Sequence, residues 1–283
     1  MQNPVSELSN RHRVLSHKSI MKTRCFTLLF LCIIHASLSE QLIEYRLSSD
    51  FTPSKGVSSI DENTLAFTGN INCEAVHIFK VKPTVPVTIS FEIRKLSENA
   101  KPVVYVGFWT YDADRIRIQP RFLRCERGGE TTLLADADAG ATSISLKPPP
   151  RQPSKAWKSI AIGGSKDCQL PQFDLIAVKA LKASEDNSLE VTLEAPLAKP
   201  LSAGTVLHFH GEGPGMYVAY DAKTPDNEWT TVTATVVGEQ EGFPVADRRW
   251  WKGTRFAKPR IVVYQSKNDK IQIRNLQVRI TTP

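Results

Sequence analysis

Residues 103–112 form a run that predicts a β-strand with apolar side chains on both faces. Side chains alternate along a strand, so Val104, Val106 and Phe108 share one face. The opposite face carries Tyr105, Trp109 and Tyr111. The first row is typical of a buried core. The second row combines two phenols and an indole, whose rings have an apolar body and a polar edge. We therefore expect this face to contact a ligand or another part of the protein.

Gly107 lies between the rings on this second face, where the absent side chain predicts a shallow space. Stacking rings beside such a space suit a sugar. A second layer of protein packed over the same rings is the alternative. The sequence leaves both interpretations open.

The remaining chain also has the pattern of strands. Short β-rich runs are separated by clusters of Pro, Gly, Asn and Asp, and helical periodicity is hard to find. The expected strands are 64–67, 75–80, 87–95, 103–111, 117–124, 215–221, 230–237, 260–265 and 270–280. In 87–95 the apolar residues alternate with polar ones, as in a β-sandwich with wet outer faces. We therefore expect an all-β fold, with a β-bulge near Arg274 and Asn275 where the last strand changes phase.

The composition changes between about residues 128 and 215. Glycine-rich stretches open and close this segment, and a run of three prolines interrupts it. The short strands expected inside it are 142–146, 157–162, 174–180, 189–193 and 205–209. Because the segment lies between two series of strands, we expect a small β subdomain at 128–215, inserted into a β-sandwich made of 40–127 and 216–283.

Residues 21–39 have the layout of a secretory signal peptide: a basic start, a short apolar run, and then small residues. The apolar run is too short for a good membrane span. Residues 1–20 read as an upstream extension, with Met21 as the start. Acylation of Cys32 in a lipoprotein is the alternative, but the bulky Leu31 disfavours it. We expect a secreted, periplasmic or cell-surface protein with no membrane span once the leader is removed.

Removal of the leader changes the charge of the chain. Residues 1–39 contain five bases and one acid, so the formal net charge falls from +7 to +3. A nucleic-acid partner then loses its main support, whereas weak attraction to an acidic polysaccharide remains. Three cysteines follow the leader, Cys73, Cys125 and Cys168. They allow one disulfide and one leftover thiol, with the pairing open.

A second candidate for ligand binding follows residue 247. It contains Arg248, Arg249, Trp250 and Trp251. Arginine forks bind carboxylate or sulfate in a bidentate manner, so this loop could clamp an acidic sugar. In the alternative, a tryptophan plugs one end of the sandwich and the bases are solvated.

Two groups of residues could bind metal. Asp112 and Asp114 place carboxylates together, as calcium requires, although Asp also initiates ordinary turns. His208 and His210 share a strand face with a spacing that can bind a metal ion, and a solvated or hydrogen-bonded histidine pair is the favoured alternative. No other cofactor is expected.

Several segments resemble jelly-roll carbohydrate-binding modules with the galactose-binding-like fold. They are 79–83, 87–94, 107–112, 228–232 and 271–280, and the resemblance covers about 45–125 and 216–283. The resemblance implies a jelly-roll sandwich, and modules of this fold often bind sugar through loops at the sandwich edge and often carry a structural calcium. Separately, 131–144 and 191–206 resemble a small β module common in surface and tail proteins, which carries no chemistry to transfer.

These observations predict an exported, non-catalytic carbohydrate-binding module. Its partner would be a polysaccharide, acidic if the basic residues contribute, and it could act beside a partner enzyme. A structural or adhesive cell-surface protein is the second interpretation. A polysaccharide-degrading enzyme is the third, because a pair of catalytic carboxylates cannot be recognised in a linear sequence. The G-x-S-x-G, H-E-x-x-H and Walker motifs are absent from the sequence.

Overall fold

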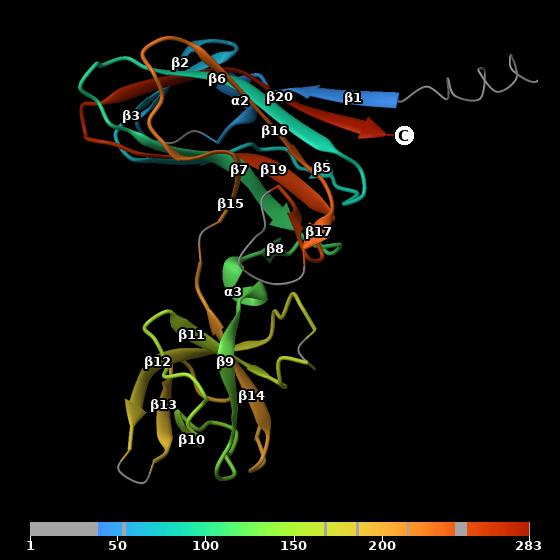
Figure 1. Ribbon diagram of the computed structural model, residues 1–283, viewed down its shortest axis with the longest axis vertical. Coiled ribbons are helices and arrows are strands. Elements are labelled where there is room, and N and C mark those ends of the chain that lie inside the picture. Colours follow the sequence, from blue (N-terminus) through green and yellow to red (C-terminus); the bar gives the residue numbers. More distant parts are fainter. Residues whose placement is uncertain are drawn as a thin grey trace, which may run out of the picture. The chain divides into compact units, whose positions relative to one another are not determined.

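The computed structural model describes residues 39–282, except for 53–54, 167–168, 185–186, 214 and 241–247. The expected extension at 1–20 lies outside the described residues, as does the expected signal peptide at 21–39 apart from Ser39. The fold is all-β, as predicted, and is built mainly from antiparallel strands (Figure 1). Within the described part of the chain, no helix is long and apolar enough to cross a membrane.

The first sheet has the strand order β16–β6–β20–β3–β2, and β1 also pairs with β20. Its strands are β1 (Ser39–Glu44), β2 (Val57–Asp61), β3 (Thr64–Thr68), β6 (Val87–Lys95), β16 (Thr230–Val236) and β20 (Lys270–Thr282). The one-turn helix α2 (Leu47–Asp50) follows β1. Burial alternates along β6, as its sequence predicts, so one face of this sheet lies in the core.

The second sheet has the order β15–β7–β19–β4, with β5 paired to β19 and β8 paired to β7. Its strands are β4 (Ile71–Glu74), β5 (Phe79–Lys80), β7 (Val103–Tyr111), β8 (Arg117–Ile118), β15 (Met216–Lys223) and β19 (Phe256–Tyr264). β7 is therefore an inner strand. β19 runs along one of its edges, whereas β15 and β8 pair with the other.

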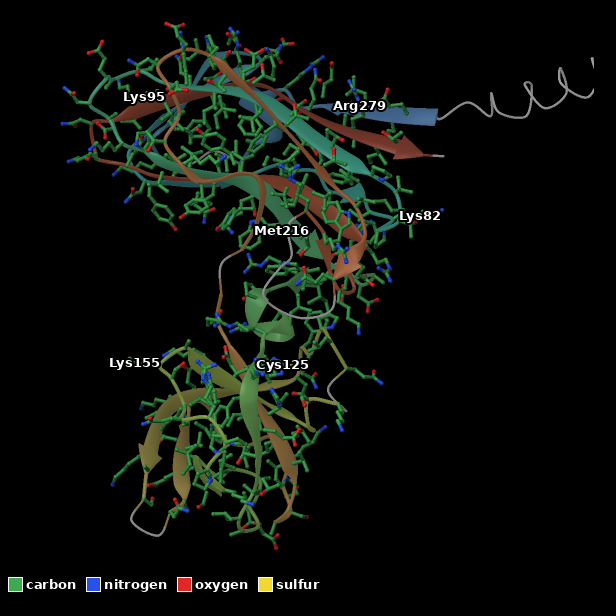
Figure 2. All side chains as sticks on the ribbon, in the orientation of Figure 1. Lys82, Lys95, Cys125, Lys155, Met216 and Arg279 are labelled. Carbon is green, nitrogen blue, oxygen red and sulfur yellow. The ribbon has the colours of Figure 1, made fainter. Side chains whose placement is uncertain are left out.

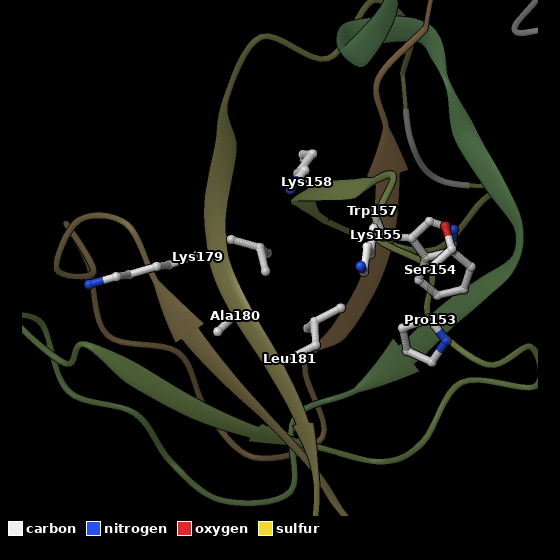
Figure 3. Close-up of a pocket in the computed structure, with 9 residues that line it drawn as sticks. Pro153, Ser154, Lys155, Trp157, Lys158, Lys179, Ala180 and Leu181 are labelled. Atoms are coloured by element: carbon white, nitrogen blue, oxygen red, sulfur yellow. The ribbon is translucent and has the colours of Figure 1, made fainter.

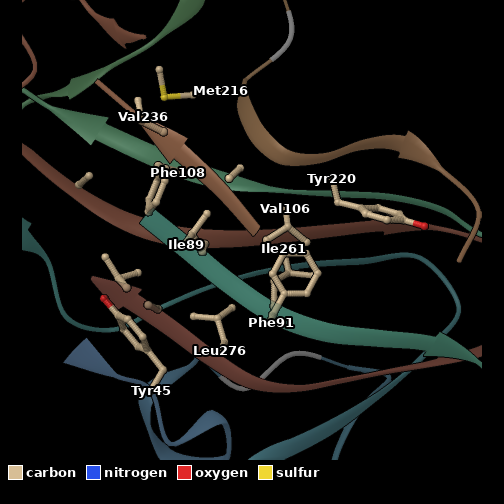
Figure 4. Close-up of a cluster of buried hydrophobic side chains, with 14 of the residues drawn as sticks. Tyr45, Ile89, Phe91, Val106, Phe108, Met216, Tyr220, Val236, Ile261 and Leu276 are labelled. Atoms are coloured by element: carbon tan, nitrogen blue, oxygen red, sulfur yellow. The ribbon is translucent and has the colours of Figure 1, made fainter. Parts of the chain in front are cut away.

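These two sheets pack face to face over one hydrophobic core. Ile89 and Phe91 of β6 lie in the same cluster as Val106 and Phe108 of β7 (Figure 4). Side chains fill the space between the two layers (Figure 2). Cys73 is buried in this core as a free thiol. Cys168 lies outside the described residues.

A third sheet has the order β10–β13–β12–β11–β14–β9. Its strands are β9 (Cys125–Thr132), β10 (Ser143–Leu146), β11 (Trp157–Ile162), β12 (Leu175–Ala183), β13 (Leu189–Leu193) and β14 (Val206–Gly211). It has its own cluster of buried residues, which includes Ile160, Val191 and Phe209 and shares no buried member with the first cluster. The division into an inserted subdomain and a sandwich remains a prediction.

The expected strand at 117–124 is divided. β8 ends at Ile118, and Pro120 begins the one-turn helix α3 (Pro120–Leu123). Proline suits the first helical position because the missing N–H has no partner there in any helix. The expected bulge in β20 is confirmed, since its pairing with β6 shifts register between Arg274 and Gln277. The remaining short strands, β17 (Glu239–Gln240) and β18 (Trp250–Trp251), pair in parallel.

Candidate functional site

The two faces of β7 have different surroundings. Val104, Val106 and Phe108 are buried in the core. Tyr105, Trp109 and Tyr111 alternate with them and are half-buried on the outer face of the second sheet. The apolar rings on this face are therefore neither in the core nor fully exposed.

The shallow space expected beside Gly107 is filled, which corrects the sequence-based expectation. A Cβ atom at this position would lie 2.2 Å from the backbone oxygen of Met216 and 2.6 Å from Cα of Tyr217. Glycine at this position thus lets the backbone of β15 approach β7 closely. Tyr217 lies opposite Gly107 in the register. Its ring centroid is 4.7 Å from that of Tyr105, so the position holds another ring in place of a gap.

The strands beside β7 add rings and cations to the same outer face. On β19, Phe256 lies opposite Tyr111, Lys258 opposite Trp109, and Arg260 opposite Gly107. We call this surface the aromatic–basic face. It consists of Tyr105, Trp109, Tyr111, Arg115, Arg117, Tyr217, Phe256, Lys258, Arg260 and Tyr264.

Trp109 lies between two guanidinium groups. The carbon of the Arg117 guanidinium is 4.4 Å from the indole centroid, and that of Arg260 is 3.7 Å from it. β8 and β19 pair with opposite edges of β7, so the two arginines approach Trp109 from opposite sides. Cation–π attraction holds both groups in place. A ligand at Trp109 therefore meets arginine donors as well as the ring.

Arg260 is held firmly. Its Nε donates a hydrogen bond to Oδ1 of Asn72 at 3.1 Å, and the residue is largely buried. Desolvation lowers the pKa of the Arg260 guanidinium from its ordinary value, because burial disfavours the charged form. A bound anion would restore favourable interactions to this charge.

Lys258 extends the row of cations. Its Nζ is 2.9 Å from a carboxylate oxygen of Glu74 and 5.9 Å from the ring centroid of Tyr111. Burial raises the pKa of the Tyr111 phenol, although the nearby ammonium opposes this shift. The phenol therefore stays protonated at neutral pH and can donate a hydrogen bond.

The other end of the face is formed by three tyrosines, Tyr105, Tyr217 and Tyr264. The centroid of Tyr105 is 5.9 Å from that of Tyr264, and the two rings meet edge to face. Tyr264 is 55% exposed, so its ring offers stacking surface to a ligand. Alternation along β19 from Phe256 to Tyr264 was the signal that could have placed its rings and cations on one face.

The loop candidate at residues 248–251 does not contribute to the aromatic–basic face. Trp250 and Trp251 are buried in the core, with exposed fractions of 0% and 2%, and Trp250 packs against Phe108 with centroids 5.2 Å apart. Arg248 and Arg249 are exposed. The two indoles offer no surface to a ligand, so this group is left out of the site proposed below.

Both candidate histidines are buried and hydrogen-bonded to backbone carbonyls. Nε2 of His208 donates to the Glu126 oxygen at 3.1 Å, and Nδ1 of His210 donates to the Arg121 oxygen at 2.9 Å. Nε2 of His210 lies 3.4 Å from Sγ of Cys125. These contacts occupy ring nitrogens that a metal would need.

Asp112 stabilises a turn. Its Oδ1 accepts hydrogen bonds from the backbone N–H groups of Asp114 at 3.0 Å and Ile116 at 2.8 Å. This is the local bonding that makes Asp common in turns. Across all described residues, no group of three or more His, Cys, Asp or Glu side chains could hold a metal ion.

Comparisons by sequence find no match, and the comparison with solved structures finds only weak likeness. No protein-family model matches the chain, and no curated protein matches it. Among solved structures, it is similar to the CBM22-1 xylan-binding domain of Xyn10C from Paenibacillus barcinonensis, with 8% identity, a TM-score of 0.32, and coverage of 87% of this chain and 97% of that one. It is also similar to the carbohydrate recognition domain of Emp47p, with 11% identity, a TM-score of 0.30, and coverage of 88% and 99%. Likeness at these scores carries no argument about function.

Proposed function

We propose that this protein is an exported, non-catalytic module that binds acidic polysaccharide through the aromatic–basic face. One observation carries the proposal: an indole lies between two guanidinium groups within a row of further rings on one sheet. Rings and arginines together suit a ligand that has both apolar C–H faces and anionic groups.

The charges on this face support an anionic ligand. Arg115, Arg117 and Arg260 form no ion pair with any described residue, and Glu74 is paired with Lys258. A carboxylate or sulfate can accept paired hydrogen bonds from a guanidinium fork. Arg260 is already positioned by Asn72, so little conformational freedom is lost when an anion binds.

The other outer face provides an internal comparison. Trp229 also lies within cation–π distance of two guanidinium groups, those of Arg94 at 4.5 Å and Arg274 at 4.1 Å. Here Arg274 forms an ion pair with Glu92, and Nε of Arg94 donates to Gln272. Arg260 makes a similar hydrogen bond to Asn72, so the ion pair of Arg274 is the difference between the two arrangements, and it favours the aromatic–basic face as the binding surface.

Binding would be weak for each sugar unit and stronger for a polymer. A repeating polysaccharide presents many copies of the ligand, so rebinding raises the effective affinity. Attraction between exposed charges is screened by salt, so binding should weaken as ionic strength rises. The leader pattern at 21–39 supports export to a compartment where such polymers occur.

Surface plasmon resonance on immobilised polygalacturonate, chondroitin sulfate and neutral xylan tests the proposal. We expect both acidic polymers to be bound more tightly than xylan. Trp109→Ala should lower the affinity about tenfold, and Arg117→Gln about fivefold, because each removes part of the Arg–Trp–Arg arrangement.

Trp229→Ala is the matched control, since it removes an indole held by two arginines on the other outer face. It should leave the affinity unchanged, and thermal melting should verify that each variant is folded. Absence of binding to every polymer would overturn the proposal, as would equal losses for Trp109→Ala and Trp229→Ala.

A further inference from the structure

A cavity of about 390 Å³ lies beside β11 and β12, in the third sheet (Figure 3). It is lined by Pro153, Ser154, Lys155, Trp157, Lys158, Val178, Lys179, Ala180 and Leu181. Neither the aromatic–basic face nor any site expected from the sequence includes these residues.

The cavity opens where β11 and β12 stop pairing. Their register joins Ser159 with Ala177 and Ala161 with Leu175, but it does not continue to Lys158 and Val178. Beyond Ala177, β12 pairs with β13 instead. The two strands therefore separate at the residues that line the cavity.

Two of the lining lysines lie at β-bulges. The pairing of β11 with β14 shifts register between Trp157 and Ser159, which places Lys158 at the irregularity. The pairing of β12 with β13 shifts between Val178 and Ala180, which places Lys179 at another. Bulges redirect side chains and often accompany binding sites. In Figure 3, Lys155 and Lys158 lie among the lining residues, whereas Lys179 extends away.

The lining is cationic and partly apolar. Its charged residues are three lysines with no acid, and none of the three forms an ion pair with a described residue. Pro153, Ala180 and Leu181 supply apolar surface that is at least partly exposed, whereas Trp157 and Val178 are buried. Ser154 accepts a hydrogen bond at Oγ from the backbone N–H of Ala156 at 3.3 Å, so its own O–H is available to donate.

We propose that this cavity binds a single acidic sugar unit, one ring with a carboxylate or sulfate group. The volume lies at the lower end of small-ligand sites, which suits one or two rings. The ammonium groups of Lys155 and Lys158 bind the anion as point charges. Pro153, Ala180 and Leu181 contact the C–H face of the ring. The sugar class rests on the proposed function, whereas the anionic chemistry rests on the cavity alone.

Lysine footprinting of the folded protein tests this site. The chain is acetylated with and without trigalacturonate, and each lysine is followed by mass spectrometry. We expect trigalacturonate to slow acetylation of Lys155 and Lys158 about threefold, because bound anion shields both amines. Lys199 is exposed in the segment between β13 and β14 and does not line the cavity, so its rate should not change.

Two further probes identify the ligand class. Neutral maltotriose and sodium sulfate are each tested in the same way. Protection by trigalacturonate alone supports the proposal. Equal protection by sulfate or by maltotriose would overturn it, since the cavity would then select an anion without a ring or a ring without an anion. Absence of protection by all three probes would also overturn it.

The two proposals fail separately. The footprint is repeated in Arg117→Gln, which alters the aromatic–basic face but not the cavity, and protection of Lys155 and Lys158 should persist. In Lys155→Gln/Lys158→Gln, titration calorimetry with trigalacturonate should lose the cavity component. Lys199→Gln is the matched control and should retain it.

Discussion

Single residues decide what the outer face of the second sheet can bind. A bare indole favours neutral sugars that stack on its face, but Trp109 is flanked by Arg117 and Arg260. The guanidinium groups replace part of the stacking surface with hydrogen-bond donors. Gly107 contributes by letting β15 approach, which brings Tyr217 against Tyr105. The residue types at these positions therefore support the acidic ligand proposed above.

Also at the scale of single residues, Cys73 makes the free energy of unfolding depend on pH in the alkaline range. Burial raises the pKa of its thiol to about 12. An unfolded thiol titrates at about pH 8.5, so above that pH the unfolded chain releases a proton that the folded chain retains. The free energy of unfolding should therefore be unaffected below pH 8 and fall by up to about 1.4 kcal/mol per pH unit between pH 9 and 12.

Urea denaturation of the wild type and Cys73→Ala from pH 7 to 11 measures this dependence. The substitution lowers stability at every pH by leaving a cavity, but its pH profile should be flatter. Burial also raises the pKa values of Tyr45, Tyr111 and Tyr220, and these residues are present in both proteins. Parallel profiles would contradict the assignment to Cys73.

Individual strands were predictable where β-forming residues run between clear turn signals. The strands at 87–95 and 103–111 coincide with β6 and β7, and 157–162 coincides with β11. The strand β9 was missed because its sequence has two adjacent glycines and several charges, and its two threonines stand together at its end. Its place in the sheet comes from pairing with β14, which is a tertiary effect.

The phase change in β20 can be tested at the level of the element. Asn275 has a φ of 54° beside the register shift, a backbone conformation that Asn and Gly tolerate better than β-branched residues. Asn275→Val should lower the free energy of unfolding by about 1–2 kcal/mol, and Asn275→Gly should be close to neutral. Chemical denaturation of both variants gives the comparison. Equal losses would instead indicate that the side-chain contact of Asn275 with Glu92 matters most.

For the whole molecule, the sequence indicated an all-β fold but not which strands pair. The candidate site depends on that pairing, because β19 joins β7 across about 150 residues of chain. Local patterns could therefore identify Tyr105, Trp109 and Tyr111 but not their neighbours Lys258 and Arg260. Burial of Trp250 and Trp251 likewise follows from packing against a distant strand.

The separate hydrophobic clusters predict two unfolding transitions. Ile89 is fully buried in the first cluster and Ile160 in the second. Ile89→Ala and Ile160→Ala should each cost about 2–5 kcal/mol, but in different parts of the chain. Scanning calorimetry should show that each variant shifts one transition and leaves the other in place. A single transition shifted by both would show that the clusters unfold together.

The guanidinium groups around Trp109 also affect how ionic quenchers reduce its fluorescence. The protein has five tryptophans, and Trp157, Trp250 and Trp251 are buried. Collisional quenchers therefore reach chiefly Trp109 and Trp229, both of which lie under arginines. Iodide is drawn to such indoles and caesium is repelled, so the contrast between the two ions is an optical signal of the charge around these two rings.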